Sequence, residues 1–272
     1  MTATPIPKDL PMTTHTAPHP TIRPTRFRQV LAVEFRKAAS TTASVALLAA
    51  IAGGIVLAAV ISIFAFNFFE EQGMPWFARV TILMTAPGFL VPPAVILLST
   101  AEWSTRSAMT TFTLVPRRSI VLAAKALVAA AIAIGAWLLA LGLGFLSYVI
   151  GAAVQGVDVE MDMPWRLAAG DLGAFFLVIA SALALALLIQ NAPAAIVVVL
   201  AVPNLISGLG MFAEWLETLV LWTNLPNALY GSLQSADPTQ PVDWARLATA
   251  ATIWVIIPGV LGWIRTLRRE AS

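Results

Sequence analysis

The 272-residue sequence contains no cysteine and few charged residues, and both shortages limit what the protein can be. Without cysteine, the chain cannot form disulfides, thiolate metal sites, palmitoylated anchors or a cysteine nucleophile. Charged residues make up 11% of the chain, against roughly 25% in a typical soluble domain, whereas hydrophobic residues make up 59%. A soluble protein of this composition would lack polar surface, so the composition indicates a membrane protein.

Histidine and buried ionisable residues are also scarce, which excludes several kinds of chemistry. His15 and His19 lie near the N-terminus without an acidic cluster, so the sequence predicts no metal site. No ionisable residue lies at the centre of a long apolar segment, which argues against an ion-coupled transporter and an intramembrane enzyme. The net charge is only +2, and the basic residues lie beside apolar segments, so we expect no nucleic-acid partner.

Long charge-free stretches fill most of the chain. A helix needs about 20 apolar residues to cross a bilayer. The sequence predicts an all-α membrane protein with six transmembrane helices, at about residues 45–66, 80–100, 126–150, 168–189, 194–212 and 247–264. The stretch 172–213 is too long for one crossing, and Gln-Asn-Ala-Pro at 190–193 predicts a tight turn that divides it into two spans.

Lysine and arginine occur on alternate connections between the spans, which predicts their orientation. If the N-terminus is cytoplasmic, all of these basic residues lie on the cytoplasmic side except Arg79, Arg166 and Arg246. An even number of spans returns the basic C-terminus to the same side. We therefore expect a multi-pass protein of the plasma (inner) membrane with both termini in the cytoplasm.

Two kinds of sequence precede the first span. Residues 1–24 hold six prolines among threonine and histidine, which predicts a disordered cytoplasmic tail. Residues 25–40 repeat apolar side chains at helical spacing among charged ones, which predicts an amphipathic elbow helix on the inner leaflet. The residues behind this prediction are Phe27, Val30, Leu31, Glu34, Phe35, Arg36 and Lys37. Anchoring of the first span is the simplest role for this helix, and contact with a cytoplasmic partner is the alternative.

Residues 213–245, before the last span, are expected on the outer side of the membrane. Their first part, 213–233, is apolar but is interrupted by Asn224, Pro226 and Asn227. A seventh span here would place the basic C-terminus outside. A half-buried or re-entrant segment and an outer cap helix are the two alternatives.

The cytoplasmic loop 102–118, after the second span, carries the strongest functional pattern. An acid at the membrane edge is followed by a Thr-rich stretch, then Pro-Arg-Arg, and then a lysine seven residues later. The arginines alone would be explained by an ordinary basic cytoplasmic loop, but the order of the acid, threonines, proline and lysine would not. A lone carboxylate at the membrane edge is costly, so we expect Glu102 to pair with an arginine of the elbow or loop. The residues of the pattern are Glu102, Thr105, Arg106, Thr113, Pro116, Arg117, Arg118 and Lys125.

This order resembles that of the ABC-2 type transporter permeases, in which Glu-x-x-x-(Gly/Thr)-x-(Arg/small)…Thr-x-x-Pro-x-Arg…Lys follows the second span. The matching residues are Glu102, Arg106, Thr113, Pro116, Arg118 and Lys125. Ser104-Thr105 stands where that family often has a Gly-Thr-like pair. The basic elbow, six spans, tight turn and outer segment are also similar to that family, so the resemblance covers about residues 25–270.

The resemblance implies the membrane-spanning permease subunit of an ATP-driven exporter. The loop would couple to a separate ABC ATPase subunit, and two permease chains, identical or related, would pair to line the pathway. The chain has no Gly-x-x-x-x-Gly-Lys-Ser/Thr sequence, so we expect no enzyme activity and no cofactor bound by this chain, with ATP and Mg on the partner ATPase. The expected cargo is amphipathic or hydrophobic: a drug, peptide, lipid or glycan.

Prolines within the spans are expected to interrupt the second and fifth helices. Each proline frees a backbone carbonyl that protein or water must satisfy. Helix packing explains these residues most simply, and a role in the pathway or dimer seam is the alternative. The residues concerned are Pro87, Pro92, Pro93, Pro203 and Asn204. Asp171, near the start of the fourth span, is expected to be solvated at the membrane interface, with an exit-gate role as the alternative.

A function of another class fits the same topology. The chain could be a membrane-embedded sensor or assembly subunit of a larger complex, with no transport activity. Such a subunit would share the six spans and the basic loops. Binding of an ATPase, or movement of a cargo, would distinguish the two functions.

Overall fold

The computed structural model describes residues 26–104, 118–159, 163–235 and 239–268, and all regular structure within these ranges is helical. Among these residues, six helices are long and apolar enough to cross a membrane: Thr42–Phe64, Trp76–Glu102, Ser119–Gln155, Trp165–Ile189, Ala192–Leu209 and Pro241–Arg268. The prediction of an all-α protein with six candidate membrane spans is confirmed. The predicted tail at 1–24 lies outside the described residues.

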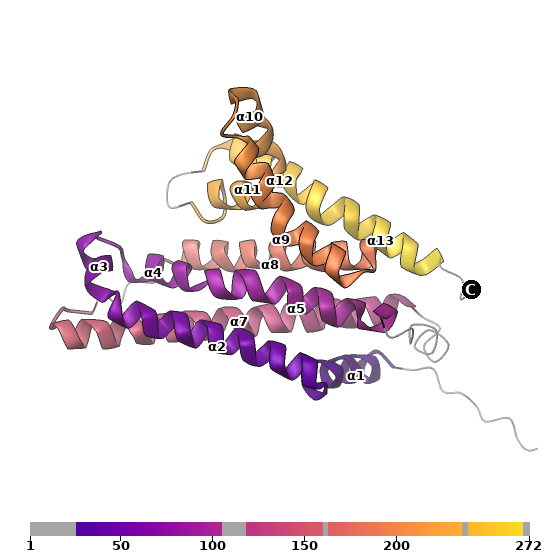
Figure 1. Ribbon diagram of the computed structural model, residues 1–272, viewed down its shortest axis with the longest axis horizontal. Coiled ribbons are helices and arrows are strands. Elements are labelled where there is room, and N and C mark those ends of the chain that lie inside the picture. Colours follow the sequence, from indigo (N-terminus) through magenta and orange to yellow (C-terminus); the bar gives the residue numbers. More distant parts are fainter. Residues whose placement is uncertain (1–25, 105–117, 160–162, 236–238, 269–272) are drawn as a thin grey trace, which may run out of the picture.

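The body of the molecule is a bundle of helices, of which α7 (Arg118–Gln155) is the longest in the described residues (Figure 1). Against α7 pack α2 (Thr42–Phe64), α5 (Thr85–Ser104) and α8 (Trp165–Ile189). The core between them holds side chains that are almost completely inaccessible, among them Ile55, Val91 and Ala133.

Further helices complete the two ends and one side of the bundle. The short α1 (Phe27–Ser40) packs on α7, and α9 (Ala192–Leu209) and α13 (Ile257–Arg268) pack on α8. In Figure 1, α1 and the C-terminal end of α13 lie at the same end of the bundle, whereas α3 (Phe66–Glu71) lies at the opposite end.

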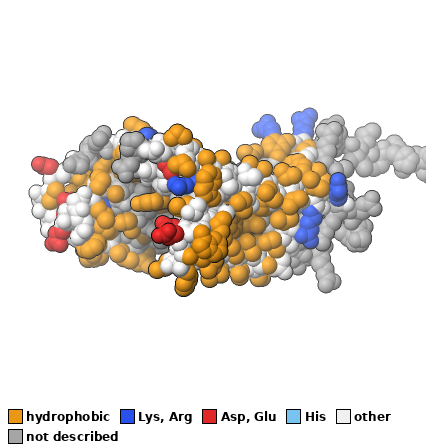
Figure 2. Space-filling view, turned by 90° about the horizontal axis from the view of Figure 1, so that it is seen from above, with side chains coloured by type: hydrophobic (Ala, Val, Ile, Leu, Met, Phe, Trp, Pro, Cys, Tyr) orange, Lys and Arg blue, Asp and Glu red, His pale blue; other side chains and the backbone are white. Residues whose placement is uncertain are grey.

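The surface of the bundle changes in character along its length (Figure 2). Hydrophobic side chains cover the middle, most lysine and arginine side chains lie toward the end that carries α1, and most acidic side chains lie toward the other end. Large apolar side chains on this surface include Leu57, Phe64 and Leu205, which are 61%, 86% and 68% exposed. So much exposed apolar surface indicates a multi-pass protein whose helices contact lipid.

The second span is divided just before Pro87, one of the three prolines that the sequence predicts to interrupt it. The helix α4 (Trp76–Leu83) ends at Met84, and Pro87 lies in the first turn of α5, where the missing N–H of proline has no helical partner to lose. In contrast, α5 continues through Pro92-Pro93 and α9 continues through Pro203. The expectation that these prolines break their helices is wrong, because neighbouring groups in a packed bundle can satisfy the carbonyls that proline frees.

The turn between α8 and α9 lies where the Asn-x-Pro pattern predicts it. Gln190 adopts a left-handed conformation with φ of 55°, which ends α8. The side chain of Asn191 accepts a hydrogen bond from the backbone N–H of Ala194 at 3.1 Å and so caps α9, and Pro193 occupies the first turn. Local chemistry therefore determines this hairpin.

The segment before the last helix is helical but too short to cross a membrane. It consists of α10 (Glu214–Thr223) and α11 (Leu225–Gly231), and it leads to α12 (Pro241–Ala251) and the π-helical turn Thr252–Ile256. Between α10 and α11 lies Asn224, which is fully buried.

The buried amide of Asn224 joins this segment to α9. Its nitrogen donates hydrogen bonds to the backbone oxygen of Pro203 at 2.6 Å and to the hydroxyl of Ser207 at 3.0 Å. Its oxygen accepts a hydrogen bond from the backbone N–H of Asn227 and so caps α11. Asn224 therefore positions α10 and α11 on the side of the bundle.

Replacing Asn224 with alanine is expected to destabilise the protein by about 1–2 kcal/mol, because a helix cap and two further hydrogen bonds are lost. Thermal unfolding of the detergent-purified protein measures the effect. The control is Asn191→Ala, which removes one capping bond from an exposed side chain and should cost less. Equal losses in the two variants would show that Asn224 acts only as a cap.

Candidate functional site

Four charged side chains meet at the end of the bundle that carries α1. Glu34 and Lys37 belong to α1, Glu102 lies near the end of α5, and Lys125 lies near the start of α7. The Lys37 Nζ atom lies 2.7 Å from Glu34 Oε1 and 2.6 Å from Glu102 Oε1. The Lys125 Nζ atom lies 3.1 Å from Glu34 Oε2 and 3.5 Å from Glu102 Oε2. Each acid in this charge network thus contacts both lysines.

Three members of the charge network are almost completely buried. Glu34, Glu102 and Lys125 are 7%, 5% and 4% exposed, whereas Lys37 is partly accessible. Burial alone lowers the pKa of Lys37, but its hydrogen bonds and attraction to Glu102 and Glu34 outweigh burial and raise that pKa above its usual value. Lys37 therefore carries its charge at neutral pH, and the network sets two acidic side chains against two basic ones.

The spacing of residues on α1 explains how Glu34 becomes buried. Val30, Glu34 and Ala38 recur every four residues, so they share the face of the helix that is covered by protein. Val30 packs with Val121 and Ala124 of α7. This apolar contact brings Glu34 to Lys125, which lies one residue beyond Ala124.

The other residues of the predicted elbow and coupling loop have different positions. Phe27 and Arg36 are exposed on α1. Arg118 is the first residue of α7. Five residues of the loop pattern lie outside the described residues: Thr105, Arg106, Thr113, Pro116 and Arg117. The sequence predicts that Glu102 pairs with an arginine. Within the described residues this prediction is wrong, because both ion-pair partners of Glu102 are lysines.

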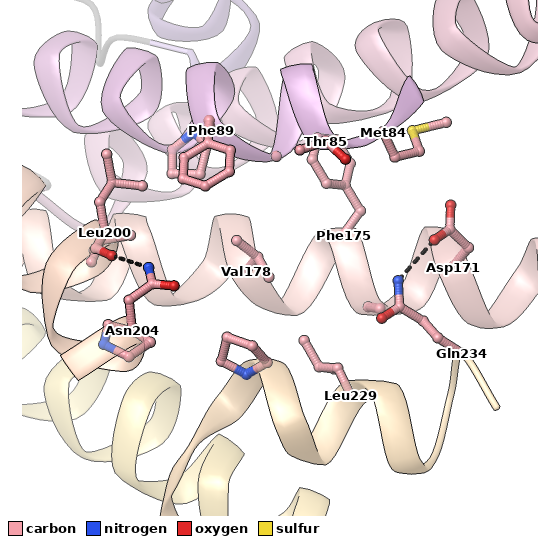
Figure 3. Close-up of a pocket in the computed structure, with 16 residues that line it drawn as sticks. Met84, Thr85, Phe89, Asp171, Phe175, Val178, Leu200, Asn204, Leu229 and Gln234 are labelled. Carbon is pink, nitrogen blue, oxygen red and sulfur yellow. Dashed lines mark hydrogen bonds between the residues drawn. The ribbon is translucent and has the colours of Figure 1, made fainter. Parts of the chain in front are cut away.

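A cavity of about 330 Å³ lies between α5, α8, α9 and α11 (Figure 3). Pro92, Pro203 and Asn204, which the sequence singles out as pathway or dimer-seam residues, line this cavity, whereas Pro93 is not among the lining residues. Most of the wall is apolar, and its volume is within the range of small-molecule sites. The structure therefore brings Pro92 of the second span and Pro203 and Asn204 of the fifth span to the wall of the same cavity.

Asp171 also lines this cavity and is buried rather than solvated. Its Oδ2 atom accepts a hydrogen bond from the indole N–H of Trp137 at 3.0 Å, and its Oδ1 atom accepts one from the side-chain amide of Gln234 at 2.9 Å. The expectation of an interfacial, solvated Asp171 is wrong, because a segment after α11 covers this part of α8.

Gly170 makes that cover possible. A Cβ atom added at Gly170 would lie 2.0 Å from the backbone oxygen of Leu233, so only glycine allows the chain to approach α8 this closely. Gln234, the next residue, then reaches Asp171. Sequence reasoning missed this contact, and a glycine beside an aspartate in an apolar helix was the available signal.

Comparison with known proteins adds no family assignment. No protein-family model matches the chain, and a search of curated proteins finds no match. The function must therefore be inferred from the charge network, the cavity and the sequence pattern of the loop that follows α5.

Proposed function

We propose that this chain is the membrane-spanning permease subunit of an ATP-driven ABC exporter and that it works with a separate ABC ATPase subunit. The observation that carries the proposal is the charge network. It joins α1 to the ends of α5 and α7, and the connection between those two helices carries the sequence pattern that resembles ABC-2 permeases. The six candidate membrane spans support the same proposal.

The charge network would transmit movement from the loop to three helices. Glu102 and Lys125 lie on either side of the loop, and both contact Glu34 or Lys37 of α1. Separating these buried partners would leave charges without compensation, which costs several kcal/mol. The ends of α1, α5 and α7 should therefore move together when a force acts on the loop.

In the proposed cycle, ATP draws two ATPase subunits together, and their motion pushes on the loop of each permease chain. The tilt of α5 and α7 then changes the side to which the pathway opens. ATP and Mg belong to the ATPase subunit. A second permease chain, identical or related, completes the transporter. The apolar wall of the cavity suits an amphipathic or hydrophobic cargo such as a drug, peptide, lipid or glycan.

The distribution of charge supports an orientation for this transporter. The end that carries α1 holds most of the basic side chains (Figure 2). Under the positive-inside rule, that end faces the cytoplasm, so both termini are cytoplasmic and the chain lies in the plasma membrane. The basic side chains would then contact anionic lipid headgroups and the ATPase.

The test is affinity purification of the tagged chain from its native membranes in mild detergent. We expect a P-loop ATPase to co-purify, and the double variant Arg117→Glu, Arg118→Glu to reduce its recovery at least about tenfold, because reversed charges repel the partner. Arg268→Glu, which reverses an exposed charge near the end of α13, should retain the ATPase. An intact wild-type chain without an ATPase would overturn the proposal, as would equal recovery with the double variant.

A further inference from the structure

Within the part of the chain that the structure describes, Asp171 differs from the other buried acids, Glu34 and Glu102, because no cation accompanies it. Glu34 and Glu102 each contact two lysines. Among the described residues, no lysine, arginine or histidine nitrogen lies within 4.0 Å of the Asp171 carboxylate, although that side chain is nine-tenths buried. Burying a carboxylate away from water is costly unless a cation or several donors compensate it.

The two hydrogen bonds of Asp171 leave part of its acceptor capacity unused. Trp137 and Gln234 donate one bond each, and both donors are neutral. A carboxylate has about four lone-pair sites, so it can accept further donors. Because Asp171 lines the cavity, a molecule inside the cavity can supply them.

Beside this carboxylate, the cavity wall is formed by apolar side chains. In Figure 3, Asp171 and Gln234 lie at one end and Asn204 lies at the other, with Phe175, Val178 and Phe89 between them. The Asn204 amide already donates a hydrogen bond to the backbone oxygen of Leu200 at 2.6 Å. A ligand that fills the cavity would therefore place a polar end at Asp171 and an apolar body along the rest of the wall.

We propose that this cavity binds an amphiphile with a single protonated amine, for which Asp171 is the counter-ion. The ammonium N–H groups would donate to the free lone pairs of Asp171, and the apolar body would lie along Phe175 and Val178. An anion would be repelled, and a divalent metal ion would need more oxygen ligands than this wall offers. The role of the site in transport rests on the proposed exporter function, whereas amine binding does not.

Equilibrium binding to the purified full-length chain in nanodiscs of zwitterionic lipid tests this proposal. The probes are tritiated desipramine, a tricyclic secondary amine, and its N-acetylated form, which has the same ring system without the charge. We expect saturable binding of desipramine. Asp171→Asn should weaken desipramine binding about 10- to 100-fold, because a charge-assisted hydrogen bond is lost. The affinity for the acetylated form should change little. Asp158→Asn, which removes an exposed carboxylate, is the matched control and should change neither.

A second variant keeps the test independent of any damage by Asp171→Asn. Gly88 lines the cavity, and a Cβ atom added there meets no other atom within 4 Å. Gly88→Leu should therefore fill the cavity without a clash at Cβ and reduce binding of both probes. Unchanged desipramine affinity in Asp171→Asn, or no saturable binding to monodisperse wild-type protein, would overturn the proposal. Because no ATPase is present in this assay, neither result alters the outcome of the co-purification test.

Discussion

Replacing Lys125 with methionine is expected to destabilise the folded protein by about 3–5 kcal/mol, the usual cost of removing one partner from a buried ion pair. Methionine retains the length and apolar stem of lysine, so the change removes little but the charge. Among the described residues, Glu34 and Glu102 would remain buried with Lys37 as their one basic partner. Unfolding of the purified protein in mixed micelles with increasing denaturing detergent measures the loss.

Two further variants determine whether charge causes this effect. Lys37→Met should destabilise the protein less, because the Lys37 side chain is 41% exposed and solvent already weakens its interactions. Glu34→Gln combined with Lys125→Met should recover part of the stability, because the network then has one buried negative charge fewer. A double variant no more stable than Lys125→Met would contradict the electrostatic explanation.

Replacing Gly262 with alanine is expected to destabilise the protein by about 1–3 kcal/mol, because α13 lies directly against the backbone of α8. A Cβ atom at Gly262 would lie 2.8 Å from the backbone nitrogen of Leu188 and 2.9 Å from the carbonyl carbon of Leu187. Backbone atoms cannot turn aside as a side chain can, so the two helices must separate. The melting temperature of the detergent-purified protein measures the effect.

Gly259 provides the matched control on the same helix. A Cβ atom at Gly259 would lie 3.7 Å from the Cβ atom of Ala184, which is an ordinary van der Waals contact. Gly259→Ala should therefore be neutral or slightly stabilising, because alanine favours the helix. Because alanine favours the helix in both variants, similar losses would show that another factor such as lipid contact, rather than the approach to α8, governs this face.

Features that depend on neighbouring residues could be predicted from the sequence. Each span is a run of apolar residues long enough to cross a bilayer, so hydropathy alone located the six candidate spans. The turn at Gln190 and Asn191 follows from short-range capping, which a pattern of three or four residues specifies. The charged residues of the loop pattern at positions 102 and 125 were also identifiable, because Glu102 ends the charge-free stretch of the second span and Lys125 precedes that of the third.

Features that depend on distant contacts could not be predicted in this way. Whether Pro92-Pro93 breaks a helix depends on the groups that surround it, which the local sequence does not specify. Asp171 is buried because Gln234, 63 residues later, covers it and Trp137, 34 residues earlier, bonds to it. Among the described residues, the partners of Glu102 are lysines, because α1 and α7 place Lys37 and Lys125 at its carboxylate.

The charge network also imposes an order on biosynthesis. Glu34 precedes its buried partner Lys125 by 91 residues. At 5–20 residues per second, the ribosome needs roughly 5–20 s to make that stretch. The helix α1 therefore cannot complete its buried contacts until two spans have been made and a third has begun. Until then, Glu34 can pair with Lys37 of its own helix, so α1 is made early but gains its buried contacts late.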